Sequence, residues 1–149
     1  MREILFRGKC TDTGTWYTGG YIHLRKTTYC FLSDYDMHPD NDIHRIVFER
    51  MTDWGLPNQH LMADVVPETV GQYTGLNDMN GTRIFEGDVL RITERGITID
   101  GGIVIFENGY PGGWLITDKE HKSKCSLATR NCVEIIGNIH DNPEFLRGN

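Results

Sequence analysis

The order of apolar and polar positions along the chain is that of short β-strands separated by turns. In the central segment, residues 65–90, alternation at 70–75 leads into a turn containing Asn80 and Gly81, and a second strand follows. The stretch from Gly71 to Gly87 contains four glycines, counting both ends. Each would destabilise a helix by about 1 kcal/mol, so the segment is predicted to be two strands joined by a turn.

The region after this hairpin is predicted to continue as strands. The predicted strands are 89–93, 97–100, 103–107, 114–117 and 133–139, with a turn at 108–113 before the fourth. Asn142 and Pro143 are predicted to begin a closing helical turn, as N-cap and first helical residue. Gly87 and Asp88, followed by a short strand, a glycine break and an apolar strand, are typical of SH3-type barrels. An ordinary β-meander fits the same pattern.

The N-terminal region is predicted to be a β-meander. Its predicted strands are 4–7, 15–18, 21–24, 27–32 and 43–50, with a helix as the alternative for the last. Gly19 and Gly20 predict a bulge or turn. Residues 33–42 are predicted to be an exposed loop, and residues 59–64 one helical turn. We place a boundary near Asp64, between an N-terminal β region (1–64) and an SH3-like region (65–149) that together form one compact unit.

Composition and charge narrow the class of protein. The 149 residues are 38% hydrophobic and 24% charged, and no apolar run approaches the roughly 20 residues that span a bilayer. The N-terminus has no long apolar segment of the signal-peptide kind, which predicts a cytoplasmic protein without membrane contact. The formal charge is −6 with scattered basic residues, so nucleic acid is an unfavoured partner.

No spacing of residues demands a metal or a cofactor. Cys10, Cys30, Cys125 and Cys132 form no C-x-x-C pair, so free thiols are predicted, with a convergent metal site as the alternative. The polar loop contains a run of carboxylates that lacks the order of an EF-hand, and a solvated turn is the favoured interpretation. The residues concerned are Asp34, Asp36, Asp40 and Asp42.

No catalytic residue is predicted, because the known hydrolase, metalloprotease and phosphate-binding motifs are absent from the sequence. Glu86 and Asp88 could hold a cation or share a proton. The favoured interpretation is that Asp88 caps the turn backbone while Glu86 faces solvent. Five aromatic residues are candidates for a binding face, although core packing is the favoured role for most of them. They are Trp16, Tyr17, Tyr21, Tyr110 and Trp114.

Several motifs resemble the YopX family of phage and prophage proteins. They lie at residues 1–7, 70–76, 78–81, 84–89 and 133–144, in the order found in that family. The resemblance implies a mainly β protein with an SH3-type barrel, encoded by a phage or prophage of a bacterial host and self-associating into a homo-oligomer. It implies no known activity and transfers no site residue.

The predicted function is that of a non-enzymatic phage accessory protein acting as a binding or assembly module. Its expected partners are further copies of itself, through a strand near residue 4 or the strand 133–139, and a host or phage protein. One alternative is single-stranded nucleic-acid binding on an aromatic barrel face, with charge from Lys119, Lys122 and Lys124. The other is a small metal-dependent or proton-transfer enzyme.

Overall fold

The computed structural model describes residues 1–110 and 112–147. The protein is mainly β, as predicted, and its strand pairs are antiparallel. By contacts the chain divides into an N-terminal unit, Ile4–Val70, and a C-terminal unit made of Met1–Glu3 and the chain from Gly71 onward. The predicted division near Asp64 into two regions of one compact unit stays a prediction.

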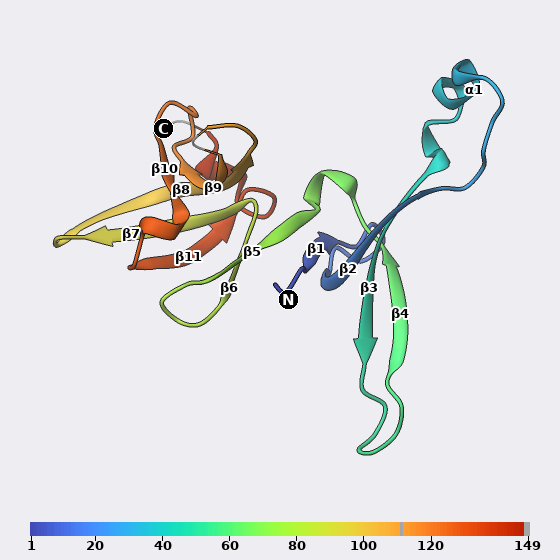
Figure 1. Cartoon of the computed structure of the whole chain (residues 1–149), viewed down its shortest axis with the longest axis horizontal. Helices are drawn as coiled ribbons and strands as arrows, with labels where there is room; N and C mark the ends of the chain where they lie inside the picture. The colour runs from blue at the N-terminus through green and yellow to red at the C-terminus, as the bar shows by residue number, and fades with distance from the viewer. Residues whose placement is uncertain (111, 148–149) are drawn as a thin grey trace. The chain divides into compact units, whose positions relative to one another are not determined.

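The N-terminal unit is built on four strands in the order β4-β3-β2-β1. These are β1 (Phe6–Lys9), β2 (Trp16–Arg25), β3 (Asp42–Arg50) and β4 (Gln59–Asp64). Figure 1 shows β3 and β4 as a long hairpin, with the chain passing between β2 and β3 through short helices. The helices of this unit are α1 (Leu32–Met37), η1 (Pro39–Asn41) and η2 (Pro67–Thr69). No helix within residues 1–110 and 112–147 has the length and apolar character needed to cross a bilayer.

The strand predicted at 27–32 is wrong, and the loop predicted at 33–42 contains most of α1 and all of η1. Side chains, including that of Asn41, bond the backbone where a neighbouring strand was expected. Asn41 is 5% exposed, and its side-chain amide accepts a hydrogen bond from the Thr27 N–H and donates one to the Thr27 carbonyl, both at 2.9 Å. The side chain therefore takes the place of a neighbouring strand, and the polar backbone at this point is satisfied without a β-ladder.

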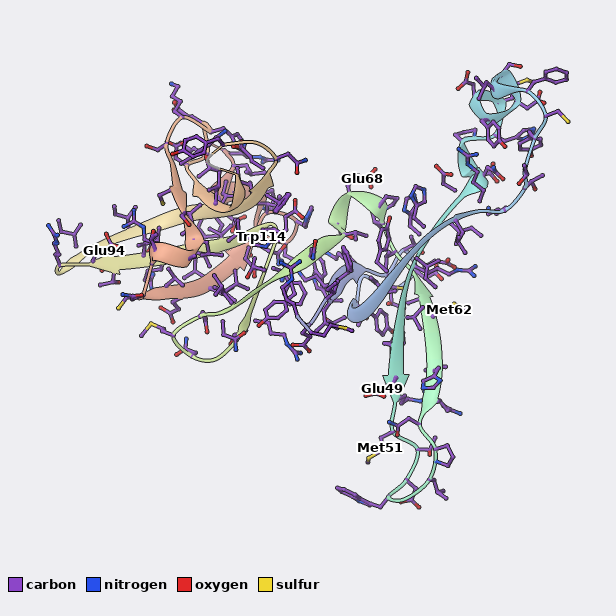
Figure 2. All side chains as sticks on the ribbon, in the orientation of Figure 1. Glu49, Met51, Met62, Glu68, Glu94 and Trp114 are labelled. Atoms are coloured by element: carbon purple, nitrogen blue, oxygen red, sulfur yellow. The ribbon has the colours of Figure 1, made fainter. Side chains whose placement is uncertain are left out.

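The helical turn predicted at 59–64 is also wrong, because this segment is β4 and pairs with β3 from Arg50↔Gln59 to Arg45↔Asp64. Its side chains alternate in exposure, and Met62 projects from the ribbon (Figure 2). An ion pair of 2.7 Å between Arg45 Nε and Asp64 Oδ1 spans the two strands. Pairing with the strongly β-forming β3, predicted at 43–50 and confirmed, overrides the local helical preference.

Gly19 and Gly20 lie in one continuous strand, so the predicted bulge or turn is wrong. Gly19 pairs with Phe6 and Gly20 with Val47, with no shift in register. A Cβ atom at Gly19 would lie 1.9 Å from the Val47 carbonyl oxygen, whereas one at Gly20 would meet nothing within 4 Å. The first glycine is therefore required by the close approach of the β3 backbone, and the second is not.

Gly19→Ala is expected to lower the free energy of unfolding by about 1–3 kcal/mol, because the new methyl group must displace backbone atoms of β3. Gly20→Ala is the matched control and should be neutral or slightly stabilising. Urea denaturation followed by circular dichroism measures both. Equal effects of the two substitutions would contradict this account of the close approach.

The C-terminal unit contains a five-stranded antiparallel sheet in the order β10-β9-β8-β7-β11 and the hairpin β5–β6. Its strands are β5 (Gly71–Asn77), β6 (Arg83–Phe85), β7 (Asp88–Glu94), β8 (Ile97–Glu107), β9 (Gly113–Thr117), β10 (Lys124–Ser126) and β11 (Val133–Asn138). Two short helices, η3 (Leu127–Thr129) and η4 (Pro143–Phe145), complete it. These strands confirm the central hairpin and the predictions at 89–93, 114–117 and 133–139.

The two strands predicted at 97–100 and 103–107 are one strand, β8, with a bulge where the break was expected. Leu90 pairs with Gly102 and Arg91 with Asp100, which leaves Gly101 unpaired at φ +95°. A glycine accepts this backbone conformation at low cost. Pro111, inside the predicted turn at 108–113, lies outside the described residues.

The closing turn begins at Pro143, as predicted, but the Asn142 side chain does not cap it. Its Oδ1 accepts a hydrogen bond of 3.2 Å from the Asn138 N–H, and its Nδ2 donates to Glu144. Asn142 thus ties the end of β11 to the turn that follows.

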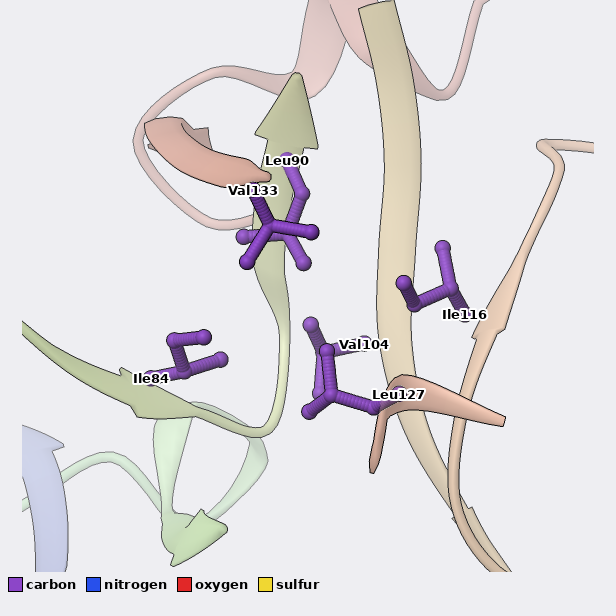
Figure 3. Packing of buried hydrophobic residues seen from close by; sticks show 6 residues of the cluster. All are labelled: Ile84, Leu90, Val104, Ile116, Leu127 and Val133. Carbon is purple, nitrogen blue, oxygen red and sulfur yellow. The ribbon is translucent and has the colours of Figure 1, made fainter. Parts of the chain in front are cut away.

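The core of the C-terminal unit lies on one face of the five-stranded sheet and is closed by β6 and η3. Figure 3 shows its six buried aliphatic residues, which are Ile84, Leu90, Val104, Ile116, Leu127 and Val133. Within the described part of the chain the hydrogen-bonded order of strands remains open, with β10 and β11 at its two ends. The SH3-type barrel therefore stays a prediction.

Candidate functional site

A cluster of His23, Asp42 and His44 lies on β2 and β3 of the N-terminal unit. In the ladder His23 is opposite His44, and Asp42, two residues before His44, shares its face of β3. The His44 carbonyl accepts from the Val65 N–H at 3.0 Å, so the backbone groups of His44 are turned toward β4 and away from β2. The two histidines therefore form a non-hydrogen-bonded cross-strand pair, the type in which side chains lie closest.

The three side chains converge. The imidazole rings of His23 and His44 stack at 4.2 Å between centroids with 20° between their planes. His23 Nε2 lies 3.7 Å from Asp42 Oδ2, and one ligand atom of each of the three residues lies within 4.8 Å of the others. The side chains of His23 and Asp42 are 52% and 50% exposed, so the cluster is open to solvent.

Tyr21 fixes the His44 ring from the same face of the sheet. Its hydroxyl lies 2.5 Å from His44 Nδ1. The two rings are nearly parallel, with 6.0 Å between their centroids. Burial raises the pKa of Tyr21, and the negative charge of Asp42 adds to this effect. The hydroxyl therefore stays protonated at neutral pH and remains a hydrogen-bond partner of the imidazole.

Two imidazoles and a carboxylate are a donor set that binds divalent transition metals. Within residues 1–110 and 112–147, His23, Asp42 and His44 form the one group of three potential ligands whose donor atoms lie within 4.8 Å of one another. No cysteine belongs to this group. Sequence reasoning missed the cluster. The signal was present as the alternating pairs Tyr21/His23 and Asp42/His44, but it becomes visible only once the register of β2 against β3 is known.

The four cysteines are free thiols, as predicted. Cys10 and Cys30 lie in the N-terminal unit, and Cys125 and Cys132 lie in the C-terminal unit. The last two line a cleft of about 800 Å³ beside the β7–β8 hairpin. Arg130 also lines this cleft and pairs with Glu94, while its buried Nε has no hydrogen-bond partner within the described residues.

The structure separates the roles of Asp88 and Glu86. Asp88 is 1% exposed, and its Oδ2 accepts a hydrogen bond of 2.7 Å from the Phe85 N–H, which confirms the predicted turn cap. The expectation that Glu86 faces solvent is wrong, since the residue is half-buried. Burial raises the pKa of Glu86, and a hydrogen bond involving the Gln72 backbone partly offsets this shift.

The five aromatic candidates lie in both units and serve mostly in packing. Tyr17 stacks on Phe48 at 4.5 Å between centroids. Trp114 packs against the buried core and meets a neighbouring phenylalanine edge-on. Trp16 lies under the guanidinium of Arg7, and Tyr21 belongs to the histidine cluster. Tyr110 is fully exposed.

The lysine candidates lie on an exposed loop and the short strand after it. Lys122 Nζ is 2.5 Å from Glu120, and Lys124 pairs with Glu107. Lys119 is exposed. Two of the three cations expected to contact nucleic acid are thus paired with carboxylates.

The carboxylates of the polar segment are also dispersed. Asp34 and Asp36 lie on the helix α1, and Asp40 lies 3.6 Å from Lys26. Of these four, Asp42 alone joins a group of potential metal ligands within the described residues, together with His44 of its own strand β3 and His23 of the adjacent strand β2.

Comparison with solved structures finds a similar fold in the crystal structure of protein EF1440 from Enterococcus faecalis. The TM-score is 0.51 and the sequence identity 20%, and the match covers 99% of this chain and 100% of that chain. At this identity the similarity supports a shared fold alone. No curated protein matches this sequence. A sequence model of the YopX protein matches residues 5–147, nearly the whole chain, and the protein therefore belongs to the YopX family.

Proposed function

We propose that this protein is a non-enzymatic binding and assembly module that associates with further copies of itself through the outer edge of β4. The observation that carries the proposal is the open edge of this strand. An uncovered strand edge is a template for pairing with another chain.

The direction of the β4 backbone groups follows from one hydrogen bond. The Val65 N–H donates to the His44 carbonyl on β3. Because backbone groups alternate in direction along a strand, Ala63 and Leu61 also face β3, while Met62 and His60 face outward. The outward Asp64 carbonyl accepts from the Thr11 N–H at 3.0 Å. The described residues place no backbone partner against the outward groups of Met62 and His60.

The edge of β11, one of the two contacts expected from the sequence, is covered within the chain. The Ile135 N–H donates to Asp78 Oδ2 at 3.1 Å, and the Met79 N–H donates to the Val133 carbonyl at 2.9 Å. Farther along, the Asn138 N–H donates to Asn142. This coverage moves the proposed contact from residues 133–139 to β4.

Two copies of β4 can pair symmetrically. In an antiparallel arrangement about a two-fold axis at Leu61, His60 of one copy is opposite Met62 of the other, and their outward groups satisfy one another. Met62, which is exposed on β4, would then be covered by the second copy. The proposed contact is isologous, so it closes as a dimer or as part of a larger closed oligomer.

Light scattering on the purified chain at micromolar concentration is expected to give a mass at least twice the 17.0 kDa of one chain. Met62→Pro should shift the mass to that of a monomer, because proline removes the outward N–H and blocks the edge, yet an edge strand tolerates it. Met62→Thr keeps the N–H and serves as the control. A monomeric parent chain, or an oligomer unaffected by Met62→Pro, contradicts the proposal.

Membership of the YopX family supports further parts of the proposal. These are an SH3-type barrel in the C-terminal unit, an origin in a phage or prophage, a cytoplasmic location in the bacterial host, and a host or phage protein as an additional partner. The pairing of Lys122 and Lys124 with glutamates speaks against the alternative of single-stranded nucleic-acid binding.

A further inference from the structure

We infer that His23, Asp42 and His44 bind one divalent transition-metal ion, with Zn²⁺ as the representative ion. The site is open, since three protein side chains hold the ion and at least one position remains for water or another ligand. It lies on the exposed face of β2 and β3 and is independent of the β4 edge.

The distances leave little rearrangement to be made. Bonds of roughly 2.0–2.1 Å from a tetrahedral ion place the donor atoms about 3.3 Å apart. His23 Nε2 and Asp42 Oδ2 already lie at 3.7 Å, and the three donors lie within 4.8 Å of one another. The side chains of His23 and Asp42 are half exposed and can therefore rotate toward a shared ion without displacing buried neighbours. The paired strands β2 and β3 hold all three Cα positions, so the rearrangement is confined to the side chains.

Tyr21 prepares His44 for this role. A histidine that binds a metal through one ring nitrogen typically donates a hydrogen bond from the other, which sets its tautomer and orientation. The Tyr21 hydroxyl lies 2.5 Å from His44 Nδ1. With the proton on Nδ1 and donated to this hydroxyl, Nε2 of His44 carries the free lone pair. Tyr21 is therefore a positioning residue.

Asp42 is available as a ligand because its cross-strand neighbour is engaged elsewhere. Arg25 is opposite Asp42 in the ladder, but its guanidinium lies over the Tyr35 ring, 4.4 Å from the centroid. Asp42 is left beside His23. The carboxylate can thus supply a negative charge to a cation placed between the histidines.

The donor set decides the class of ion. Imidazole nitrogen suits Zn²⁺, Co²⁺, Ni²⁺ and Cu²⁺, whereas Mg²⁺ and Ca²⁺ prefer oxygen ligands throughout. The site is therefore expected to take Zn²⁺ or Co²⁺ in the presence of excess Mg²⁺.

The test is titration of the full chain with Zn²⁺ by calorimetry and with Co²⁺ by absorption spectroscopy, each in excess Mg²⁺. One ion per chain is expected. His23→Gln and His44→Gln should each weaken binding by about tenfold or more. Tyr21→Phe should weaken it by about tenfold while all three ligands remain, which is the typical loss when the hydrogen-bond partner of a metal-binding histidine is removed. His121→Asn is the matched control, because it removes an exposed histidine from the C-terminal unit at a positive φ that asparagine accepts.

Three results would overturn the inference. One is the absence of binding by the parent chain, and another is binding that His23→Gln and His44→Gln leave unchanged. The third is an intense Co²⁺–thiolate absorption that survives both substitutions, which assigns the ion to the free cysteines. Circular dichroism of each variant verifies the fold, and Asp42→Asn, which keeps the shape of the side chain, provides a further variant with the charge removed.

Discussion

Leu90→Ala is expected to lower the free energy of unfolding by about 2–5 kcal/mol, the range found when a buried leucine is truncated in a packed core. Leu90 is fully buried at 0% exposure on β7, with Gly102 of β8 on one side and Ile135 of β11 on the other. Neighbouring strands hold the backbone on both sides, so the space left by the side chain cannot readily collapse. Urea denaturation measured by tryptophan fluorescence should report the loss, since Trp114 packs against the same cluster.

The matched control is Ile97→Ala on the β7–β8 hairpin, where the side chain is 66% exposed. This substitution should change the free energy of unfolding by no more than about 0.5 kcal/mol. If Leu90→Ala costs no more than Ile97→Ala, the six-residue cluster is not the core that stabilises the C-terminal unit.

Asp78→Asn is expected to cost about 2–4 kcal/mol, because a buried carboxylate that accepts several backbone hydrogen bonds is replaced by a neutral amide with its own donors. Asp78 Oδ1 accepts from the N–H groups of Asn80 and Thr82, and Oδ2 accepts from the Ile135 N–H. The carboxylate thereby closes the β5–β6 turn and joins it to the edge of β11. With asparagine, one donor in this set faces another donor.

The effect of Asp78→Asn should depend on pH. Burial raises the pKa of Asp78, but the N–H groups of Ile135, Thr82 and Asn80 outweigh burial and hold the pKa below its usual range. The unfolded chain therefore binds the proton more readily than the folded one. The stabilisation is fully present above the unfolded pKa of about 3.9 and is lost as the pH falls through the folded pKa.

Denaturation of parent and variant at pH 7 and near pH 3 provides the measurement, and the difference between them should shrink at the lower pH. Asp118→Asn is the control, because Asp118 accepts the same kind of backbone hydrogen bonds in an exposed loop where water can replace them. Its cost should be smaller. A difference for Asp78→Asn that stays constant across this pH range would contradict the role given to the charge.

Strands whose own residues favour β-structure could be predicted from the sequence. Residues 89–93 and 133–139 are rich in β-branched residues and form β7 and β11, and the alternation at 43–50 gives β3. Residues 59–64 were wrongly predicted as a helical turn, because their strand conformation comes from pairing with β3. The prediction for 27–32 failed for a similar reason, since side chains elsewhere bond its backbone: Asn41 bonds that of Thr27, and the Tyr35 hydroxyl bonds that of Tyr29.

The candidate sites divide along the same line. The cap made by Asp88 lies three residues from its donor, and local turn chemistry is enough to predict it. The cluster of His23, Asp42 and His44 depends on register across a long connection, and a slip of one residue would place the histidines on opposite faces of the sheet. No local spacing in the sequence carries that information.

The position of β11 has a consequence for the chain as it leaves the ribosome. The N-terminal unit ends at Val70, so all of its strands are available early in synthesis. β7, by contrast, lies between β8 and β11 and keeps one side unpaired until residues 133–138 emerge. During that interval the edge of an apolar strand is exposed on the nascent chain, and an unpaired strand edge of this kind favours aggregation until β11 covers it.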